Sequence, residues 1–159
     1  MRCNGRLCRM LDRGDPIRAI RAVILVYREF EQTSRLSEMN MGQYRTLLFL
    51  RSGPKRAGEI AEAALLKKPT VTSRLNGLRE KGWILDGTDP TDGRAARIEI
   101  TPEGLAQMKG FEELLAQRFA ALFPGRDLTQ ILETLAQIYR LLGESKEARM
   151  LDAEEMWLR

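Results

Sequence analysis

The chain of 159 residues contains no histidine and only two cysteines, and no apolar run reaches the roughly 18 residues that a membrane-spanning helix needs. Without histidine, the chain lacks the usual general base and the commonest transition-metal ligand. Cys3 and Cys8 cannot by themselves form a four-ligand zinc site. A phosphate-binding glycine loop and a nucleophile elbow are also missing, so we expect no enzyme, no metal and no cofactor.

The amino-terminal segment is basic, with four arginines in residues 1–14, but it lacks the apolar core of a signal peptide. We therefore expect a cytoplasmic protein whose residues 1–14 form a flexible arm. Cys3 and Cys8 lie in this arm, where thiols without a special role are the default and a redox switch is the alternative. The net charge of +4 and the isoelectric point near 9.3 suit a polyanionic partner.

A short basic helix is predicted between Pro69, which suits a first helical turn, and Gly82, which suits a left-handed position after the helix. One face carries the apolar stripe of Val71, Leu75 and Leu78. The opposite face is small and polar, and basic residues flank it. Such a face can enter a DNA major groove while its rim meets phosphates, although a solvated amphipathic helix has the same pattern.

A β-hairpin is predicted next, because three turn-forming pairs, beginning with Asp86-Gly87, precede an alternating strand at residues 96–100. In that strand Ala96, Ile98 and Ile100 would share the buried face. Thr101-Pro102-Glu103 then has the cap chemistry of a new helix. Arg94 lies at the loop tip, from which an arginine can reach a narrow minor groove. The alternative is an ordinary surface hairpin.

Two segments, GEIAEAALLKKPTVTSRLNGLREKGWI and DPTDGRAARIEITPEG, give the chain its resemblance to the MarR family of winged helix-turn-helix transcription regulators. The second segment is the more specific, because the family's wing usually reads D-P-x-D-x-R before a strand, L-T and x-x-G. Ile100 replaces that leucine. The resemblance extends more loosely from about Ile17 to Leu142. The family often has an arginine at the position of Ser73 and a basic residue at the position of Asp86.

The remaining helices are predicted from apolar periodicity and capping signals. A first helix starts at Asp15-Pro16, and a second runs from the Asn40–Gln43 capping box to Leu50. A third covers residues 57–64, and a long helix follows the wing to about Phe123. Another begins with capping-box spacing at residues 127–130 and ends at Gly143, before a final segment over residues 146–158. In the second helix we expect four core residues, which are Tyr44, Leu47, Leu48 and Leu50.

The predicted fold class is mainly α with a small β-wing. We divide the chain into the arm, a winged helix-turn-helix lobe at residues 37–101, and a helical dimerisation region at residues 15–36 and 102–159. The terminal helices carry more apolar residues than the lobe can cover, and such stripes usually find a partner. In MarR relatives these helices interdigitate across a twofold axis, which implies a homodimer. A monomeric helical bundle is the alternative.

The resemblance implies a sequence-specific DNA-binding transcription regulator, in this family most often a repressor, on a palindromic double-stranded operator. The expected phosphate contacts are Lys67, Lys68, Arg79 and Arg97. The candidates for base-edge contacts are Pro69, Thr70, Thr72, Ser73, Arg74 and Asn76. Arg94 would enter the minor groove. For Arg74, base reading and phosphate contact both stay open.

Many MarR relatives also bind a small aromatic or anionic effector that lowers DNA affinity. Tyr27, Tyr44 and Arg45 are the residues that the resemblance offers for such a pocket, whereas two core tyrosines and a solvated arginine are the alternative. The second hypothesis for the whole chain is a helical protein-interaction module that uses a winged helix without specific DNA binding. Salt-sensitive binding to duplex DNA separates the two hypotheses.

Overall fold

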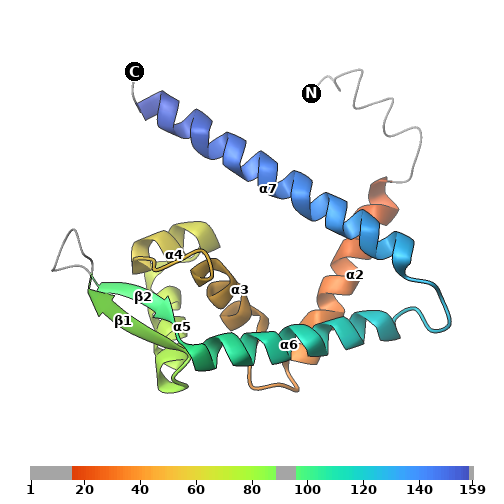
Figure 1. The fold of residues 1–159 in the computed structure, drawn as a ribbon, viewed down its shortest axis with the longest axis horizontal. Coiled ribbons are helices and arrows are strands. Elements are labelled where there is room, and N and C mark those ends of the chain that lie inside the picture. Colours follow the sequence, from red (N-terminus) through yellow and green to blue (C-terminus); the bar gives the residue numbers. More distant parts are fainter. Residues whose placement is uncertain (1–15, 89–95, 158–159) are drawn as a thin grey trace. The chain divides into compact units, whose positions relative to one another are not determined.

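The computed structural model of the chain describes residues 16–88 and 96–157, with side chains described as far as residue 143. It confirms the mainly helical class with a two-stranded wing (Figure 1). The chain divides into two compact units after Phe119. The elements are α2 (Pro16–Ser34), α3 (Met41–Leu50), α4 (Ala57–Ala64), α5 (Lys68–Glu80), β1 (Ile84–Thr88), β2 (Ala96–Ile100), α6 (Pro102–Ala121) and α7 (Thr129–Trp157).

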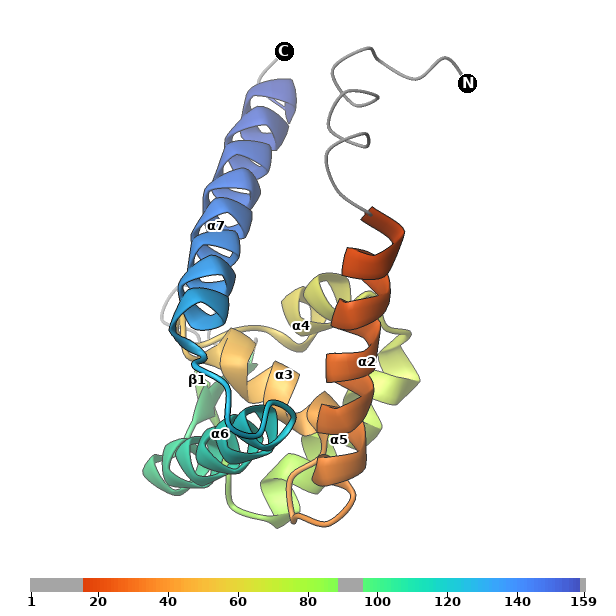
Figure 2. The same ribbon diagram turned by 90° about the vertical axis from the view of Figure 1, so that its right-hand side faces the viewer.

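The core of the first unit lies where α3, α4, α5, the wing and α6 meet. Leu47, Leu78 and Ile98 are among its most completely buried side chains. Val71 and Leu75 join Leu78 in this core, so the predicted apolar stripe of α5 is confirmed. Figure 2 views α6 almost along its axis. This helix is tied to α3 by a hydrogen bond from Tyr44 to Glu112, and to α2 by an Arg118–Glu29 ion pair and the Phe30 and Phe119 rings.

Helix α3 begins with the predicted capping box. The Gln43 amide donates to Asn40 Oδ1 at 2.9 Å, and the Asn40 amide donates to Gln43 Oε1 at 3.1 Å. Leu47 and Leu50 are buried as expected, and Tyr44 is half-buried. The expectation that Leu48 is a core residue was wrong, since this side chain is exposed. Each helical residue turns by about 100°, which carries Leu48 well away from the stripe of Leu47 and Leu50.

Helices α4 and α5 form the helix-turn-helix. Leu65 caps α4 in the left-handed conformation, with φ of 53°, and its side chain is 92% exposed. Among the described residues it is the one non-glycine with a positive φ. Pro69 lies in the first turn of α5, and Gly82 follows the helix with φ of 69°, so both predicted end signals are confirmed. Trp83, directly after Gly82, is buried.

The wing is an antiparallel pair in which Ile84 faces Ile100 and Thr88 faces Ala96. The predicted alternation holds for Ile98, which is buried, and for Ile100, which is partly buried. Ala96 was expected on the buried face but is exposed, because it lies at the outer end of the ladder, beyond the core. A backbone bridge from Lys55 to Ile98 joins the wing to the segment before α4. The loop that carries Arg94 lies outside the described residues.

Helix α6 starts at the predicted cap. The Thr101 hydroxyl donates to the Gly82 carbonyl at 2.7 Å and accepts from the Gly104 amide at 3.0 Å. The helix ends at Ala121, two residues before the expected end at Phe123, and the chain turns at Gly125 with φ of 69°. Asp127 Oδ1 accepts from the Thr129 amide and hydroxyl, so Asp127 binds Thr129 instead of completing a capping box with Gln130.

Helix α7 is continuous from Thr129 to Trp157, so the expected end at Gly143 was wrong. A single glycine costs a helix only about 1 kcal/mol relative to alanine, and no proline follows it. The following residues, ESKEARML, are mostly strong helix formers. Several large apolar side chains of α7 are exposed, including Leu132, Ile138 and Tyr139. Within the described ranges, no helix has the length and apolarity to cross a bilayer.

Candidate nucleic-acid interface

The face of α5 opposite its buried stripe forms a shallow groove on the surface. Its lining residues are Lys68, Pro69, Thr72, Ser73, Asn76, Gly77 and Glu80. This is the small polar face that the sequence predicted, and it includes four of the six candidates for base contact. Gly77 contributes no side chain to this groove. A Cβ added at Gly77 would have only Gln43 Nε2 within 4 Å, at 3.8 Å, so the space beside the backbone is open. A second molecule can therefore approach the backbone of α5 closely here.

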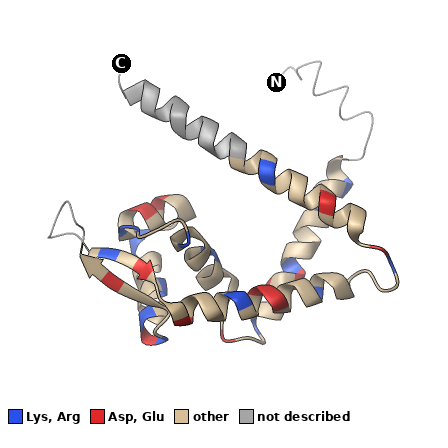
Figure 3. Cartoon of the chain, viewed as in Figure 1, with Lys and Arg blue, Asp and Glu red and all other residues tan. Residues whose placement is uncertain are grey.

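The amino-terminal end of α5 concentrates positive charge. Lys67 is the N-cap and Lys68 the first helical residue, and both side chains are exposed. Their charges add to the positive end of the helix dipole. Thr70 is also exposed, and the Thr72 hydroxyl donates to the Lys68 carbonyl at 3.0 Å, which leaves the hydroxyl oxygen as an acceptor. Helix α5 ends at an acidic residue, Glu80, and Figure 3 shows how basic and acidic residues are distributed over the chain.

Arg74 lies on the side of α5 that faces the start of α3. It lines a second groove with Asn40 and Gln43, and its Nη2 lies 2.9 Å from where a Cβ on Gly42 would be. Burial of the guanidinium lowers the pKa of Arg74, repulsion from Arg45 lowers it further, and Tyr27 acts in the opposite direction. Arg74 therefore lines a neighbouring groove, which shares Pro69, Ser73 and Gly77 with the groove that Asn76 lines.

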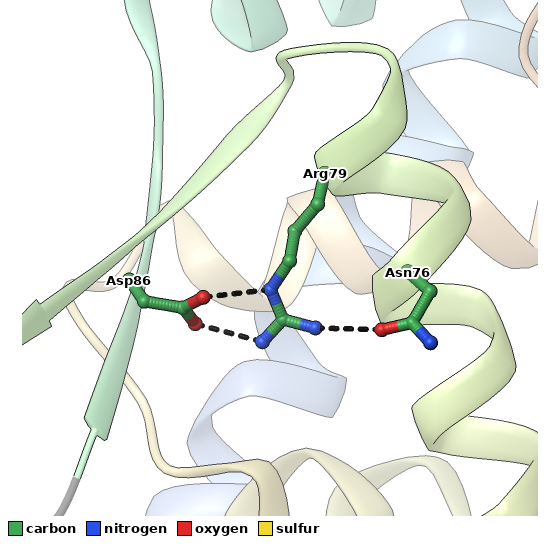
Figure 4. Close-up of polar contacts among 3 residues, drawn as sticks. All are labelled: Asn76, Arg79 and Asp86. Carbon is green, nitrogen blue, oxygen red and sulfur yellow. Dashed lines mark hydrogen bonds and ion pairs between the residues drawn. The ribbon is translucent and has the colours of Figure 1, made fainter.

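Arg79, at the other end of α5, is engaged within the protein. Its Nε and Nη2 donate to Asp86 Oδ2 and Oδ1 at 2.8 and 2.7 Å, and its Nη1 donates to Asn76 Oδ1 at 3.0 Å (Figure 4). The paired hydrogen bonds raise the pKa of Arg79 and lower that of Asp86. This bidentate pair links the last turn of α5 to β1. This pair was not predicted from the sequence, although the opposite charges at positions 79 and 86 are a signal for it.

The predicted phosphate contact Arg97 and the three residues predicted for an effector pocket lie in three different places. On β2, Arg97 lies opposite Gly87, and its Nη1 donates to the Pro54 carbonyl at 3.4 Å. Tyr27 and Arg45 lie close enough to Arg74 to change its pKa. Tyr44 instead donates its hydroxyl to Glu112 Oε1 at 3.0 Å and packs its ring 5.4 Å from that of Phe111. The structure thus brings Tyr27 and Arg45 near Arg74, while the Tyr44 hydroxyl is directed to α6.

A helix-turn-helix followed by a two-stranded wing, with a small polar face on the second helix, defines a winged helix-turn-helix domain. The profile of the MarR family matches residues 37–95, which cover α3, α4, α5 and β1. This part of the chain is therefore similar to the MarR family, and the described elements have the fold of a winged helix-turn-helix protein.

Two curated proteins and a solved structure are also similar to this chain. The chain is 26% identical over 102 residues to the HTH-type transcriptional repressor IacR of Pseudomonas putida, an alignment that spans 64% of this chain and 61% of that repressor. It is 26% identical over 130 residues to a putative transcriptional regulatory protein for the hcr operon of Thauera aromatica, covering 79% and 78%. The structure of Bordetella bronchiseptica BpsR, described for regulation of its DNA binding by 6-hydroxynicotinic acid, has a TM-score of 0.57 at 23% identity, covering 83% and 93%.

Proposed function

We propose that this protein is a DNA-binding transcription regulator, acting as a repressor, which binds a palindromic operator as a homodimer. The observation that carries the proposal is the exposed face of α5, where small polar side chains line a groove next to exposed Lys67 and Lys68. Val71, Leu75 and Leu78 anchor the opposite face in the core, so the helix presents this face rigidly. The names of the two sequence relatives support the same class.

In this proposal α5 enters a major groove. Lys67 and Lys68 bind phosphates at its amino-terminal end, where the helix dipole adds to their charge. Ser73 and Asn76 lie centrally on the exposed face, where they meet base edges, and Arg97 binds phosphate from the wing. Arg94, outside the described residues, is assigned to the minor groove. The other candidates for contacts with base edges are Pro69, Thr70, Thr72 and Arg74, and a phosphate contact is the alternative for Arg74.

The homodimer is proposed from apolar side chains that are exposed on a helix of each of the two units. On α2 these include Ile20, Val23 and Ile24, which are 56%, 66% and 60% exposed. Further examples on α7 are Leu132 and Ile138. Covering such stripes with a second copy removes apolar area from water and gives two α5 helices related by a twofold axis, which suits a palindromic site.

Regulation by a small aromatic anion is proposed for the region around Arg74. Arg45 and Arg74 repel each other electrostatically, so an anion close to both would be favoured, and Tyr27 offers an aromatic surface nearby. BpsR, whose DNA binding 6-hydroxynicotinic acid regulates, is a relative with a ligand of this type. Since Arg74 belongs to α5, a ligand held there could shift the helix and lower DNA affinity.

A footprint on the DNA beside the protein's own gene tests the proposed function. We expect a protected pseudo-palindrome whose binding falls steeply with salt, because lysines and arginines displace counterions from DNA. Lys68→Ala should weaken binding to every duplex, whereas Lys109→Ala, an exposed lysine on α6, should have no effect and serves as the matched control. Binding that does not change with salt would instead favour a protein-interaction module.

A further inference from the structure

We propose that Arg79 and Asp86 act as a positioning pair that fixes which end of the Asn76 amide faces DNA, so that Asn76 selects guanine. This inference rests on the proposed function, which it deepens by naming a base preference. It assigns the partly exposed Arg79 to holding Asn76 in place instead of to a phosphate contact. The contacts among these three residues are those drawn in Figure 4.

The orientation of the Asn76 amide follows from the chemistry of its partner. A guanidinium group has only donors, so the Asn76 atom 3.0 Å from Arg79 Nη1 must be the oxygen. The nitrogen, Nδ2, is therefore the free end. Among the described residues no acceptor binds Nδ2, and Asn76 lines the groove on the exposed face of α5. Asn76 thus presents two N–H donors outward, while one lone pair of its oxygen accepts from Arg79.

Asp86 holds the arginine in place. Its carboxylate accepts from both Nε and Nη2 of Arg79, a fork-to-fork arrangement that fixes the plane of the guanidinium. With that plane fixed, Nη1 has a defined direction, which is toward Asn76. The pair also places one positive and one negative charge together, so it adds no net charge to the surface that would meet DNA. A side chain paired in this way suits positioning better than attraction of phosphates.

The free donors determine what Asn76 can read. Asparagine normally reads adenine by accepting from N6 and donating to N7 at the same time, which needs the amide oxygen. Because Arg79 already binds Oδ1 and holds that end of the amide toward the protein, we expect Nδ2 to be the end that meets the base. Guanine offers two neighbouring acceptors, O6 and N7, in the major groove, whereas cytosine offers a donor there. We therefore expect guanine to be preferred at one base pair per half-site.

The first test is selection of the full chain on a library of randomised duplex DNA, followed by binding to single-base variants of the recovered site. At one position, guanine should bind about five- to a hundredfold more tightly than adenine, and Asn76→Ala should remove that difference. If the wild type enriches no sequence, the proposed function fails. If it enriches a site but Asn76→Ala changes no base preference, or the Asn76-dependent position prefers adenine, only the present inference is overturned.

The second test separates positioning from phosphate contact. Arg79→Ala should relax the preference at the Asn76-dependent base pair and leave the slope of log affinity against log salt unchanged. Lys68→Ala is the comparison, because losing a phosphate contact weakens all sequences alike and reduces the salt slope by about one. An Arg79→Ala variant that behaves like Lys68→Ala would overturn the inference.

The third test reverses the pair. In the double variant Arg79→Glu with Asp86→Arg the ion pair is kept, but the carboxylate introduced on α5 can only accept. It should therefore bind Asn76 Nδ2 and turn Oδ1 outward. The preferred base should change from guanine to one that presents a donor, adenine or cytosine. An unchanged preference for guanine in a variant that melts like the wild type would contradict the inference.

If the double variant melts well below the wild type, Asn76→Asp takes its place. Aspartate has the same size and keeps an acceptor for Arg79, but it has no donor to present outward. The guanine preference should then disappear while the melting temperature stays near that of the wild type. Retention of the preference in Asn76→Asp would overturn the inference.

Discussion

Gly104, in the first turn of α6, lies directly against the backbone of Trp83. A Cβ on Gly104 would lie 2.2 Å from the Trp83 carbonyl oxygen, which is closer than Cβ atoms in proteins approach another heavy atom. The same short approach lets Thr101 donate to the Gly82 carbonyl. The glycine therefore fixes how α6 leaves the wing, and through it the position of the wing relative to α5.

Gly104→Ala should destabilise the protein by about 1–3 kcal/mol, because the added methyl group forces the Trp83 backbone to move. Gly110→Ala in the same helix is the matched control, since an added Cβ there meets nothing within 4 Å. That variant should be stabilised by roughly 0.5–1 kcal/mol through helix propensity. Urea unfolding at one fixed protein concentration measures both. Equal effects of the two substitutions would contradict the close approach.

Leu65→Asn should stabilise the protein by about 1 kcal/mol. Leucine has a steric cost in the left-handed conformation that asparagine tolerates better, and little burial is lost because Leu65 is 92% exposed. Leu36→Asn is the matched control, because Leu36 is 91% exposed and is not among the positive-φ residues. Thermal unfolding of the two variants measures the difference. A destabilised Leu65→Asn would mean that this leucine has a packing role.

The Arg79–Asp86 pair should stabilise the fold in a pH-dependent way. Because the folded-state pKa of Asp86 is lowered, the contribution is present above the aspartate's unfolded pKa and is lost as the pH falls through its folded pKa. At pH 7 we expect a coupling of about 0.5–1 kcal/mol, since both side chains are partly exposed. A double-mutant cycle with Arg79→Ala and Asp86→Asn at about pH 7 and about pH 2.5 measures this coupling. An equal coupling at both pH values would exclude the ion pair as its source.

The proposed dimer should have twice the 18.1 kDa mass of one chain in sedimentation at micromolar concentration. Ile24→Glu places a charge on the exposed apolar stripe of α2, and it should weaken the dimer at least about a hundredfold, roughly 3 kcal/mol. Leu48→Glu is the control, because Leu48 is an exposed apolar residue of the proposed DNA-binding lobe. A wild-type monomer, or equal dissociation in both variants, would contradict the proposed interface.

The elements that local chemistry determines could be predicted from the sequence. The Asn40–Gln43 capping box, the turn at Gly82 and the Thr101 cap each depend on a few adjacent residues, and the structure confirms all three. The buried stripe and the polar face of α5 were predicted from the helical spacing of its apolar residues. The errors at Leu48 and Gly143 came from treating an apolar residue as buried and a glycine as a helix end, when three-dimensional context decides both.

The part of the candidate site that could not be predicted depends on contacts between elements. Arg79 and Asp86 are seven residues apart on a helix and a strand, and no local periodicity brings them together. Whether Arg74 contacts bases or phosphates could not be predicted, because its surroundings include Gly42 and Arg45 of α3, which are distant in the sequence. Arg79 was expected to contact a phosphate, and its bonds to Asp86 and Asn76 are the basis on which we propose a positioning role instead.

The most direct test of the central claim, that α5 reads a DNA sequence, compares two duplexes of identical composition. One carries the footprinted site and the other a scrambled version, and fluorescence anisotropy at about 150 mM salt measures the affinity of the full chain for each. We predict that the site binds at least about a thousandfold more tightly. Equal affinities for the two duplexes would contradict the account.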